Sequence, residues 1–261
     1  MLYCKGIEQG TDPAKKIKKT LDSVPRLCYT ERVKGVHRMT KIDKRFTYYM
    51  TIDTETANSV DDPLIYDIGL AIHDKSGRVY ETRSLVIADI YCGERELMKS
   101  AYYAEKLPKY EEALKNGDRK MVTLFTARKI IRDLCKEYNV KAIIAHNSRF
   151  DYNALNTSIR YITKSKYRYF LPYGVPMYDS LKMARDTIVK QKTYRKFCEK
   201  YGYFTKTGQL KATAEVLYRY ISGQHDFTEE HQGLDDVLIE VAISAKCFAQ
   251  HKPMRKLLFA R

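Results

Sequence analysis

Tryptophan is absent from the 261-residue chain, and no two of its cysteines stand in a C-x-x-C pair. The six cysteines are widely scattered, so their spacing gives no support to a zinc site and favours free thiols in a reducing compartment. No apolar run is long enough to cross a bilayer, and the start of the chain carries no secretory pattern. We therefore expect a cytoplasmic protein that does not enter a membrane.

Acidic residues are also in short supply: 32 Asp and Glu stand against 47 Lys and Arg, which gives a net charge of +15. Such an excess favours a polyanionic partner, most often nucleic acid, although it also maintains solubility. Residues 1–45 are especially basic and show little apolar periodicity. We interpret them as a basic N-terminal extension that either contacts nucleic acid or packs on the domain surface. One domain is expected over residues 46–261.

The order of the predicted elements indicates an α/β fold with a mixed sheet flanked by helices. Three strands come first and form an antiparallel meander with a tight turn over residues 74–77. Two later strands are expected to run parallel to the first. Strands are predicted at 46–54, 64–73, 78–87, 141–145 and 175–178. Helices are predicted at 94–115 with an interruption at Pro108, and at 123–138, 151–162, 180–189, 194–201, 210–222 and 234–250. In the last helix, an apolar stripe is expected from Leu234, Leu238, Val241, Ala245 and Phe248.

The first strand ends in two carboxylates, Asp53 and Glu55. Side chains two positions apart in a strand point to the same face, so these anions lie side by side and repel each other unless a cation intervenes. Hard divalent cations such as Mg²⁺ take oxygen ligands. Taken alone, Asp-x-Glu at a strand end favours an ordinary strand-to-loop transition with solvated charges.

Two further acidic sites have similar alternatives. Asp151 follows the buried strand at 141–145, where ligands collect in α/β sheets, but it also fits the N-cap of the next helix. The stretch from Glu230 to Asp236 enters the last helix, and acids in a first turn are favoured by the helix dipole. None of the three sites is decisive by itself.

Together, in this order, the three sites resemble the three motifs of the DEDDh (DnaQ-like) 3'-5' exonucleases, which have a ribonuclease H-like fold. The likeness extends from about Phe46 to Phe248 and includes the stretch Tyr178 to Arg185. The three motifs are Ile52-Asp53-Thr54-Glu55-Thr56, Ala145-His146-Asn147-Ser148-Arg149-Phe150-Asp151 and His231-Gln232-Gly233-Leu234-Asp235-Asp236.

The resemblance implies the roles of individual residues. The catalytic residues would be Asp53, Glu55, Asp151, His231 and Asp236. The four carboxylates would hold two divalent cations, Mg²⁺ or Mn²⁺, and His231 would be the general base. Asp236 is preferred over Asp235 because the family separates its His and Asp by about five positions. Glu55, Thr56 and Asn147 would contact the terminal nucleotide.

We therefore expect a metal-dependent 3'-5' exonuclease that hydrolyses phosphodiester bonds at single-stranded DNA ends by a two-metal mechanism. The motifs do not separate DNA from RNA, so a 3'-5' exoribonuclease is the alternative. A nucleic-acid-binding proofreading subunit of a polymerase assembly, on the same fold, is another. The complete carboxylate set favours activity but does not argue against association with a polymerase.

Overall fold

The structure is a computed structural model that describes residues 42–99, 104–229 and 233–259. Most of the basic segment predicted over residues 1–45 lies outside the described residues, and the domain boundary at residue 45 stays a prediction. Ile42, the first described residue, packs against the main hydrophobic core. The Tyr48 hydroxyl donates a hydrogen bond to the Asp43 carbonyl at 3.0 Å. These contacts attach residues 42 and 43 to the domain.

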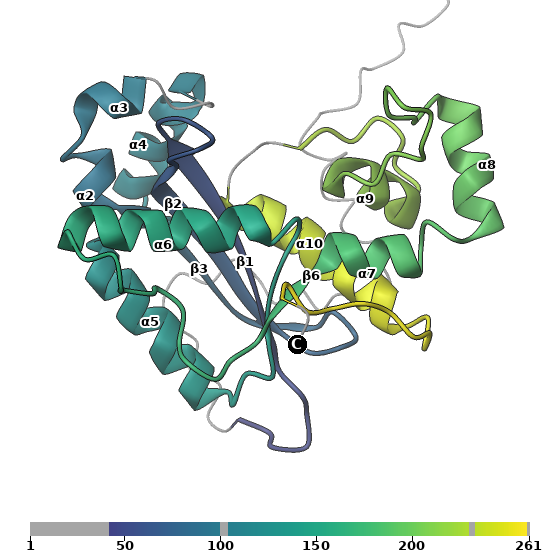
Figure 1. Cartoon of the computed structure of the whole chain (residues 1–261), viewed down its shortest axis with the longest axis horizontal. Coiled ribbons are helices and arrows are strands. Elements are labelled where there is room, and N and C mark those ends of the chain that lie inside the picture. Colours follow the sequence, from purple (N-terminus) through teal and green to yellow (C-terminus); the bar gives the residue numbers. More distant parts are fainter. Residues whose placement is uncertain (1–41, 100–103, 230–232, 260–261) are drawn as a thin grey trace, which may run out of the picture.

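Six strands form one mixed sheet in the order β4-β3-β2-β1-β5-β6 (Figure 1). The strands are β1 (Tyr49–Ala57), β2 (Leu64–His73), β3 (Val79–Ile87), β4 (Lys120–Val122), β5 (Ile143–Ala145) and β6 (Met177–Asp179). The first three pair antiparallel, whereas β5 runs parallel to β1 and β6 parallel to β5. The predicted meander followed by parallel strands is confirmed, and the architecture is consistent with a ribonuclease H-like fold. The short β4, parallel to β3, was not predicted.

The turn between β2 and β3 is held by Asp74. Its carboxylate oxygen Oδ1 accepts hydrogen bonds from the backbone of Ser76 at 2.8 Å and of Arg78 at 3.2 Å. Gly77 has a φ of +86°, a left-handed conformation that suits glycine. This local chemistry explains why the turn and both flanking strands were predicted within one residue.

Helices cover both faces of the sheet (Figure 1). They are α2 (Ala88–Tyr91), α3 (Arg95–Lys99), α4 (Leu107–Lys115), α5 (Leu124–Glu137), α6 (Arg149–Thr163), α7 (Ser180–Asp186), α8 (Lys192–Tyr201), α9 (Ala214–Ser222) and α10 (Gly233–Phe248). A 3-10 turn, η1, spans Ala104–Lys106. No helix in the described parts of the chain is both long and apolar enough to cross a bilayer.

The alternation of side chains along β1 assigns its two faces to different cores. Met50 and Ile52 are fully buried in the main core with α5 and α6. Tyr49 faces the other way, and its ring centroid lies 4.9 Å from that of Phe248 in α10. Asp53 and Glu55 share the parity of Tyr49, so they lie on the face that α10 covers.

Three helix predictions are corrected by the structure. Residues 94–115 do not form one interrupted helix but α3, η1 and α4, with residues 100–103 outside the described residues. Pro108 lies in the first turn of α4, where backbone N–H groups have no acceptor within the helix, so it does not interrupt a helix there. α9 begins at Ala214 rather than near residue 210, because the Thr213 hydroxyl caps it by accepting from the Val216 amide at 3.4 Å.

The apolar stripe predicted for α10 was only partly right. Val241 is buried, but Leu234, Leu238, Ala245 and Phe248 are half-buried. The helix packs against β1 and β2 on one side and against α7 and α9 on the other, so most of its circumference is covered. Its other buried residues are Gly233, Val237, Ile239, Glu240, Ala242, Ile243, Ser244 and Cys247.

The end of the described chain covers the outer edge of β6. The Leu258 amide donates to the Met177 carbonyl at 2.9 Å, and the Asp179 amide donates to the Lys256 carbonyl at 2.7 Å. Leu258 itself is 7% exposed and belongs to the main core. A short strand-like segment thus satisfies an edge that would otherwise present unpaired backbone groups.

Candidate active site

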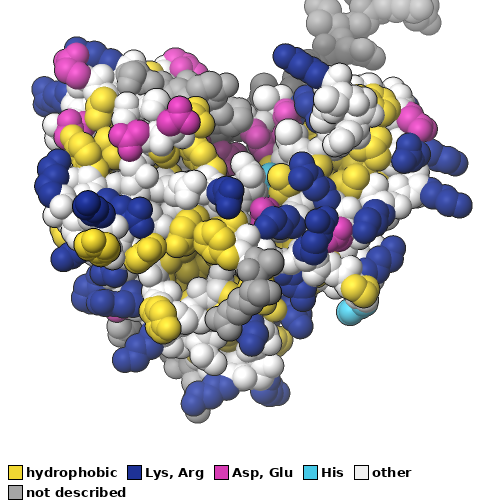
Figure 2. Space-filling model, in the orientation of Figure 1, with side chains coloured by type: hydrophobic (Ala, Val, Ile, Leu, Met, Phe, Trp, Pro, Cys, Tyr) yellow, Lys and Arg dark blue, Asp and Glu magenta, His cyan; other side chains and the backbone are white. Residues whose placement is uncertain are grey.

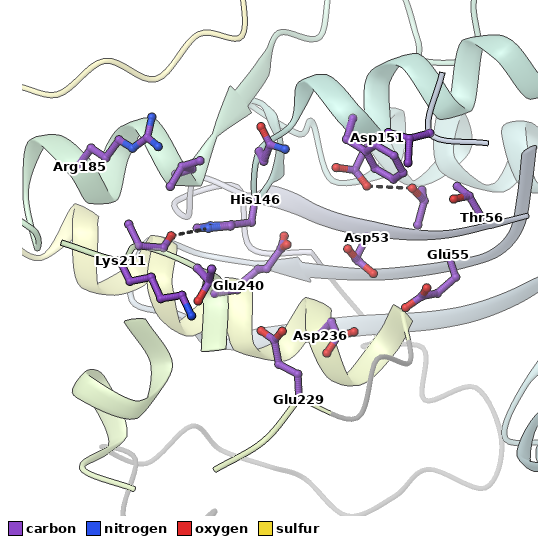
Figure 3. A pocket seen from close by; sticks show the side chains of 18 of the residues that line it. Asp53, Glu55, Thr56, His146, Asp151, Arg185, Lys211, Glu229, Asp236 and Glu240 are labelled. Carbon is purple, nitrogen blue, oxygen red and sulfur yellow. Dashed lines mark hydrogen bonds between the residues drawn. The ribbon is translucent and has the colours of Figure 1, made fainter. Parts of the chain in front are cut away.

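Three carboxylates from two elements meet beside the sheet. Asp53 and Glu55 project from β1, and Asp236 projects from the first turn of α10 (Figure 3). One carboxylate oxygen from each lies within 4.8 Å of the others. The structure therefore brings together residues that are separated by more than 180 positions in the sequence. Asp235, the alternative to Asp236 in the third motif, is exposed and lies outside the group.

α10 reaches this position because two glycines allow its first residue to touch β2. A Cβ atom on Gly69 would lie 2.1 Å from the carbonyl carbon of Gly233, so no larger side chain fits there. The Gly233 amide also donates to the carboxylate of Asp67 at 3.3 Å. That carboxylate is buried and accepts from Arg119 at 2.6 Å and from Tyr110 at 2.8 Å. The start of α10 is thus attached to β2 by a buried polar network.

Asp151 approaches the site from the other side of β1. It lies inside the first turn of α6, which begins at Arg149 after Ser148, so the N-cap alternative for Asp151 was wrong. Its carboxylate Oδ1 accepts a hydrogen bond from the Thr54 hydroxyl at 2.9 Å. Asp151 lines the same pocket as Asp53 but is not within the 4.8 Å group.

Burial makes the ionised form of these acids costly. It raises the pKa of Asp151 to about 7, against an ordinary value of 3.8, although the Thr54 hydrogen bond lowers it. The pKa of Asp53 is raised well above its usual range, first by burial and then by repulsion from Glu240, Asp151 and Asp236. A cation placed among the carboxylates would relieve both effects.

Glu240 is a site residue that the sequence analysis missed. It follows Asp236 by one helical turn, is 4% exposed and lines the pocket. Figure 3 shows its carboxylate directed toward Asp53. Its pKa is raised well above 4.5 by burial, and then by repulsion from Asp151. A signal was present, since Glu240 is the one charged residue in the run Val237-Leu238-Ile239-Glu240-Val241-Ala242-Ile243.

These groups line an open cavity of about 920 Å³ between the sheet and the segment that precedes α9. Thr56 and Asn147, the candidate contacts of the terminal nucleotide, both line it. Asn147 has a φ of +60°, which turns the chain between β5 and α6. Arg185 and Lys211 also line the cavity, on the side of α7 and of the segment before α9 (Figure 3).

His146 is held as a neutral structural link. Its Nε2 lies 3.0 Å from the Ala212 carbonyl, which can only accept, so this nitrogen carries the proton. Its Nδ1 lies 2.9 Å from the Ser180 hydroxyl, which then donates to it. Burial lowers the pKa of His146 to about 4, so the ring is neutral at pH 7. Both ring nitrogens are engaged in fixing the end of β5 to α7 and to the segment before α9.

His231, the candidate general base, lies outside the described residues, as do Glu230 and Gln232. Glu229 is described and lines the cavity next to that segment. Burial raises its pKa to about 7. The role of His231 therefore stays a prediction.

No protein-family model matches the sequence, and no curated protein matches it. Solved structures with a similar arrangement include E. coli exonuclease I in complex with a 5cy-dT13 oligonucleotide, at 14% identity and a TM-score of 0.46, over 77% of this chain and 40% of that one. The zinc-bound form of an E. coli exonuclease I–ssDNA complex has 13% identity and a TM-score of 0.48, over 79% and 41% of the two chains.

A structure of exonuclease X in complex with 5'-overhanging duplex DNA has 14% identity and a TM-score of 0.36, over 78% of this chain and 92% of that one. This chain spans about two fifths of the length of the two exonuclease I chains. Likeness at this level does not assign an activity, which has to be inferred from the residues of the site.

Proposed function

We propose that the protein is a metal-dependent 3'-5' exonuclease that removes nucleotides from single-stranded DNA ends. The observation that carries the proposal is the group formed by Asp53, Glu55 and Asp236, whose carboxylate oxygens lie within 4.8 Å of one another in an open cavity. These residues stand at the positions that the first and third exonuclease motifs imply. Asp151, from the second motif, lines the same cavity.

The donor set fits divalent cations that prefer oxygen. Asp53, Glu55 and Asp236 each offer one carboxylate oxygen to the same small region, and hard cations such as Mg²⁺ prefer such ligands. Asp53, Glu55, Asp151 and Asp236 would hold the two cations. When bound, the cations would stabilise the charge that develops on the attacking and leaving oxygens of a phosphodiester.

The chain's own residues would divide the remaining work. His231 would accept a proton from the attacking water, because an imidazole with a pKa near 6.5 is largely neutral at pH 7. Glu55, Thr56 and Asn147 would position the terminal nucleotide. Burial around Asp151 would keep water away from one side of the reacting phosphate.

Charge supports a nucleic acid as the substrate. Arg185 and Lys211 line the cavity on the side away from β1, where they could meet backbone phosphates. Figure 2 shows Lys and Arg side chains spread over this face of the molecule and gathered along α7 and α8. The net charge of +15 acts in the same direction.

The test is digestion of end-labelled oligonucleotides with Mg²⁺ or Mn²⁺. With a 5' label on single-stranded DNA, we expect a ladder of shortened labelled products, and with a 3' label, immediate release of a labelled mononucleotide. The reverse pattern would overturn the polarity. Faster digestion of RNA would favour the exoribonuclease alternative, and binding without any digestion would favour a non-catalytic subunit.

Asp236→Asn and Asp235→Asn form a matched pair for this assay, because the two residues are neighbours and only Asp236 belongs to the carboxylate group. We expect Asp236→Asn to abolish digestion and Asp235→Asn to retain it. Equal activity of the two variants would remove Asp236 from the site.

His231→Ala tests the general base. His251→Ala is its control, because His251 is exposed and lies outside the cavity. Loss of a general base typically costs about 10²–10⁴-fold in rate. We expect a loss of this size for His231→Ala alone. We also expect the wild-type rate to rise with pH as His231 loses its proton, and this rise to be absent from His231→Ala. An unchanged rate and pH profile would exclude His231 from the mechanism.

A further inference from the structure

We propose that Glu240 is an additional cation ligand, which joins Asp53 and Asp151 to form a second divalent-cation position beside the one made by Asp53, Glu55 and Asp236. The inference rests on the proposed metal-dependent function and assigns to the site a carboxylate that the three sequence motifs do not contain.

The first reason is the position of Glu240. Residues four apart on a helix lie on the same face, so Glu240 and Asp236 project from α10 toward the same side. Both line the cavity. In Figure 3 Asp53 lies between Glu55 and Glu240, so the Glu240 carboxylate faces Asp53 from the side opposite Glu55. Asp53 is therefore placed to bridge two cation positions.

The second reason is that one oxygen of the Glu240 carboxylate is buried without a matching donor. The residue is 4% exposed, and no hydrogen-bond donor among residues 42–99, 104–229 and 233–259 reaches its Oε2 atom. Within the same residues, no Lys, Arg or His forms an ion pair with it. A buried oxygen left in this state destabilises the fold, and does so more strongly when it is charged. A divalent cation is the partner that this atom lacks.

The third reason is the proximity of Asp151. Asp151 and Glu240 line the same cavity, and after burial, repulsion from Asp151 also raises the pKa of Glu240. The Thr54 hydroxyl donates a hydrogen bond to Asp151 Oδ1 at 2.9 Å, and Asp151 lines the cavity. Among the described residues, the ligand oxygens of Asp53, Asp151 and Glu240 do not all lie within 4.8 Å of one another, so these side chains would move closer together to share a cation. Asp53 and Glu240 line the same cavity as Asp151.

A metal-binding measurement tests the proposal independently of activity. Binding of Mn²⁺ alone is titrated by electron paramagnetic resonance and calorimetry in the wild type, in Glu240→Gln and in Glu229→Gln. Glu229 supplies the matched control, because its substitution removes one carboxylate from the same cavity. Gln has nearly the shape of a protonated Glu, and the melting temperature without metal checks the fold.

We expect the wild type and Glu229→Gln to bind two Mn²⁺ ions, and Glu240→Gln to keep one and to bind the second at least 10-fold more weakly. Equal weakening in both variants would reveal a general effect of charge and overturn the proposal, as would two unchanged Mn²⁺ ions in Glu240→Gln. If Glu240→Gln does not fold, Glu240→Asp moves the charge by one methylene, and unaltered Mn²⁺ binding in that variant would also overturn it.

The result for the wild type distinguishes a failure of the Glu240 proposal from a failure of the proposed nuclease function. A wild type that binds no Mn²⁺ would contradict the metal-dependent function itself. If the wild type digests DNA and Glu240→Gln binds Mn²⁺ as the wild type does, the nuclease function would stand. Glu240 would then not belong to the site.

Discussion

Replacing Asp151 by asparagine should make the metal-free protein more stable at neutral pH. The carboxyl of Asp151 is 3% exposed and its pKa is raised to about 7. An asparagine side chain at this position would be neutral at every pH and would keep an oxygen that accepts from the Thr54 hydroxyl. The substitution therefore removes a titrating charge from the apo site without removing its hydrogen bond.

The magnitude follows from the difference between the two pKa values. Between pH 3.8 and about 7 the folded protein holds a proton on Asp151 that the unfolded chain has released. The stability that Asp151 contributes is complete below its pKa in the unfolded chain. It is lost as the pH rises through its pKa in the folded protein. At 1.36 kcal/mol for each pH unit, the loss reaches an upper limit of about 4 kcal/mol by pH 8.

Denaturant unfolding in the presence of a chelator, repeated from pH 4 to pH 8, measures this effect. The free energy of unfolding of Asp151→Asn minus that of the wild type should grow by up to about 4 kcal/mol over this range. Saturating Mn²⁺ should reverse the order, because only the wild type offers an ionised ligand. A difference that stays constant with pH would refute the reasoning, because Asp151 would then titrate alike in both states.

Three further substitutions and one control variant test the packing around the start of α10 and at the edge of β6. Gly69→Ala should lower stability by about 1–3 kcal/mol or more, because the new Cβ would meet the Gly233 carbonyl at 2.1 Å. It should also weaken Mn²⁺ binding. A normal melting temperature would contradict this prediction. Arg119→Gln should cost about 3–5 kcal/mol, measured by denaturation, because it leaves the buried Asp67 carboxylate without its cation. Leu258→Ala should destabilise by about 2 kcal/mol in a thermal melt, whereas Leu257→Ala, at a 41% exposed position, should be nearly neutral.

Local patterns were sufficient for the long elements. β2 was predicted with its observed bounds because ten mostly apolar or small residues lie between a polar loop and the Asp74 turn. α5 was predicted within one residue at each end because its buried residues repeat at helical spacing and Thr123 caps it. In both cases the deciding interactions are between residues close in sequence.

The elements that were missed or misjudged depend on distant partners. β4 has three residues and exists because it pairs with β3, so no periodicity could reveal it. The region from 94 to 115 has helical composition throughout, but tertiary contacts divide it into short pieces. α10 is covered on opposite sides, so its burial does not follow the single stripe expected of a surface helix.

The site residues also divide into those that local sequence predicts and those that depend on distant parts of the chain. Asp53 and Glu55 could be paired from sequence because strand alternation is a local rule, and the grouping confirms it. Asp236 could be joined to them only through the resemblance of the motifs. Glu240 belongs to no motif, and its one local signal, a charge in an apolar run, does not show which cavity it faces.

The placement of α10 connects the core of the protein to its chemistry. The contact between Gly69 and Gly233 fixes Asp236 and Glu240 relative to Asp53. The sequence around Gly69 or around Gly233 does not by itself predict this close approach of the two backbones. The same contact directs the Gly233 amide to Asp67, whose charge is balanced by Arg119 from the segment before β4. The repulsion among the buried carboxylates opposes this arrangement, whereas the packing of α10 on β2 maintains it. A cation bound among the carboxylates would remove that repulsion, so metal binding and α10 packing should stabilise each other.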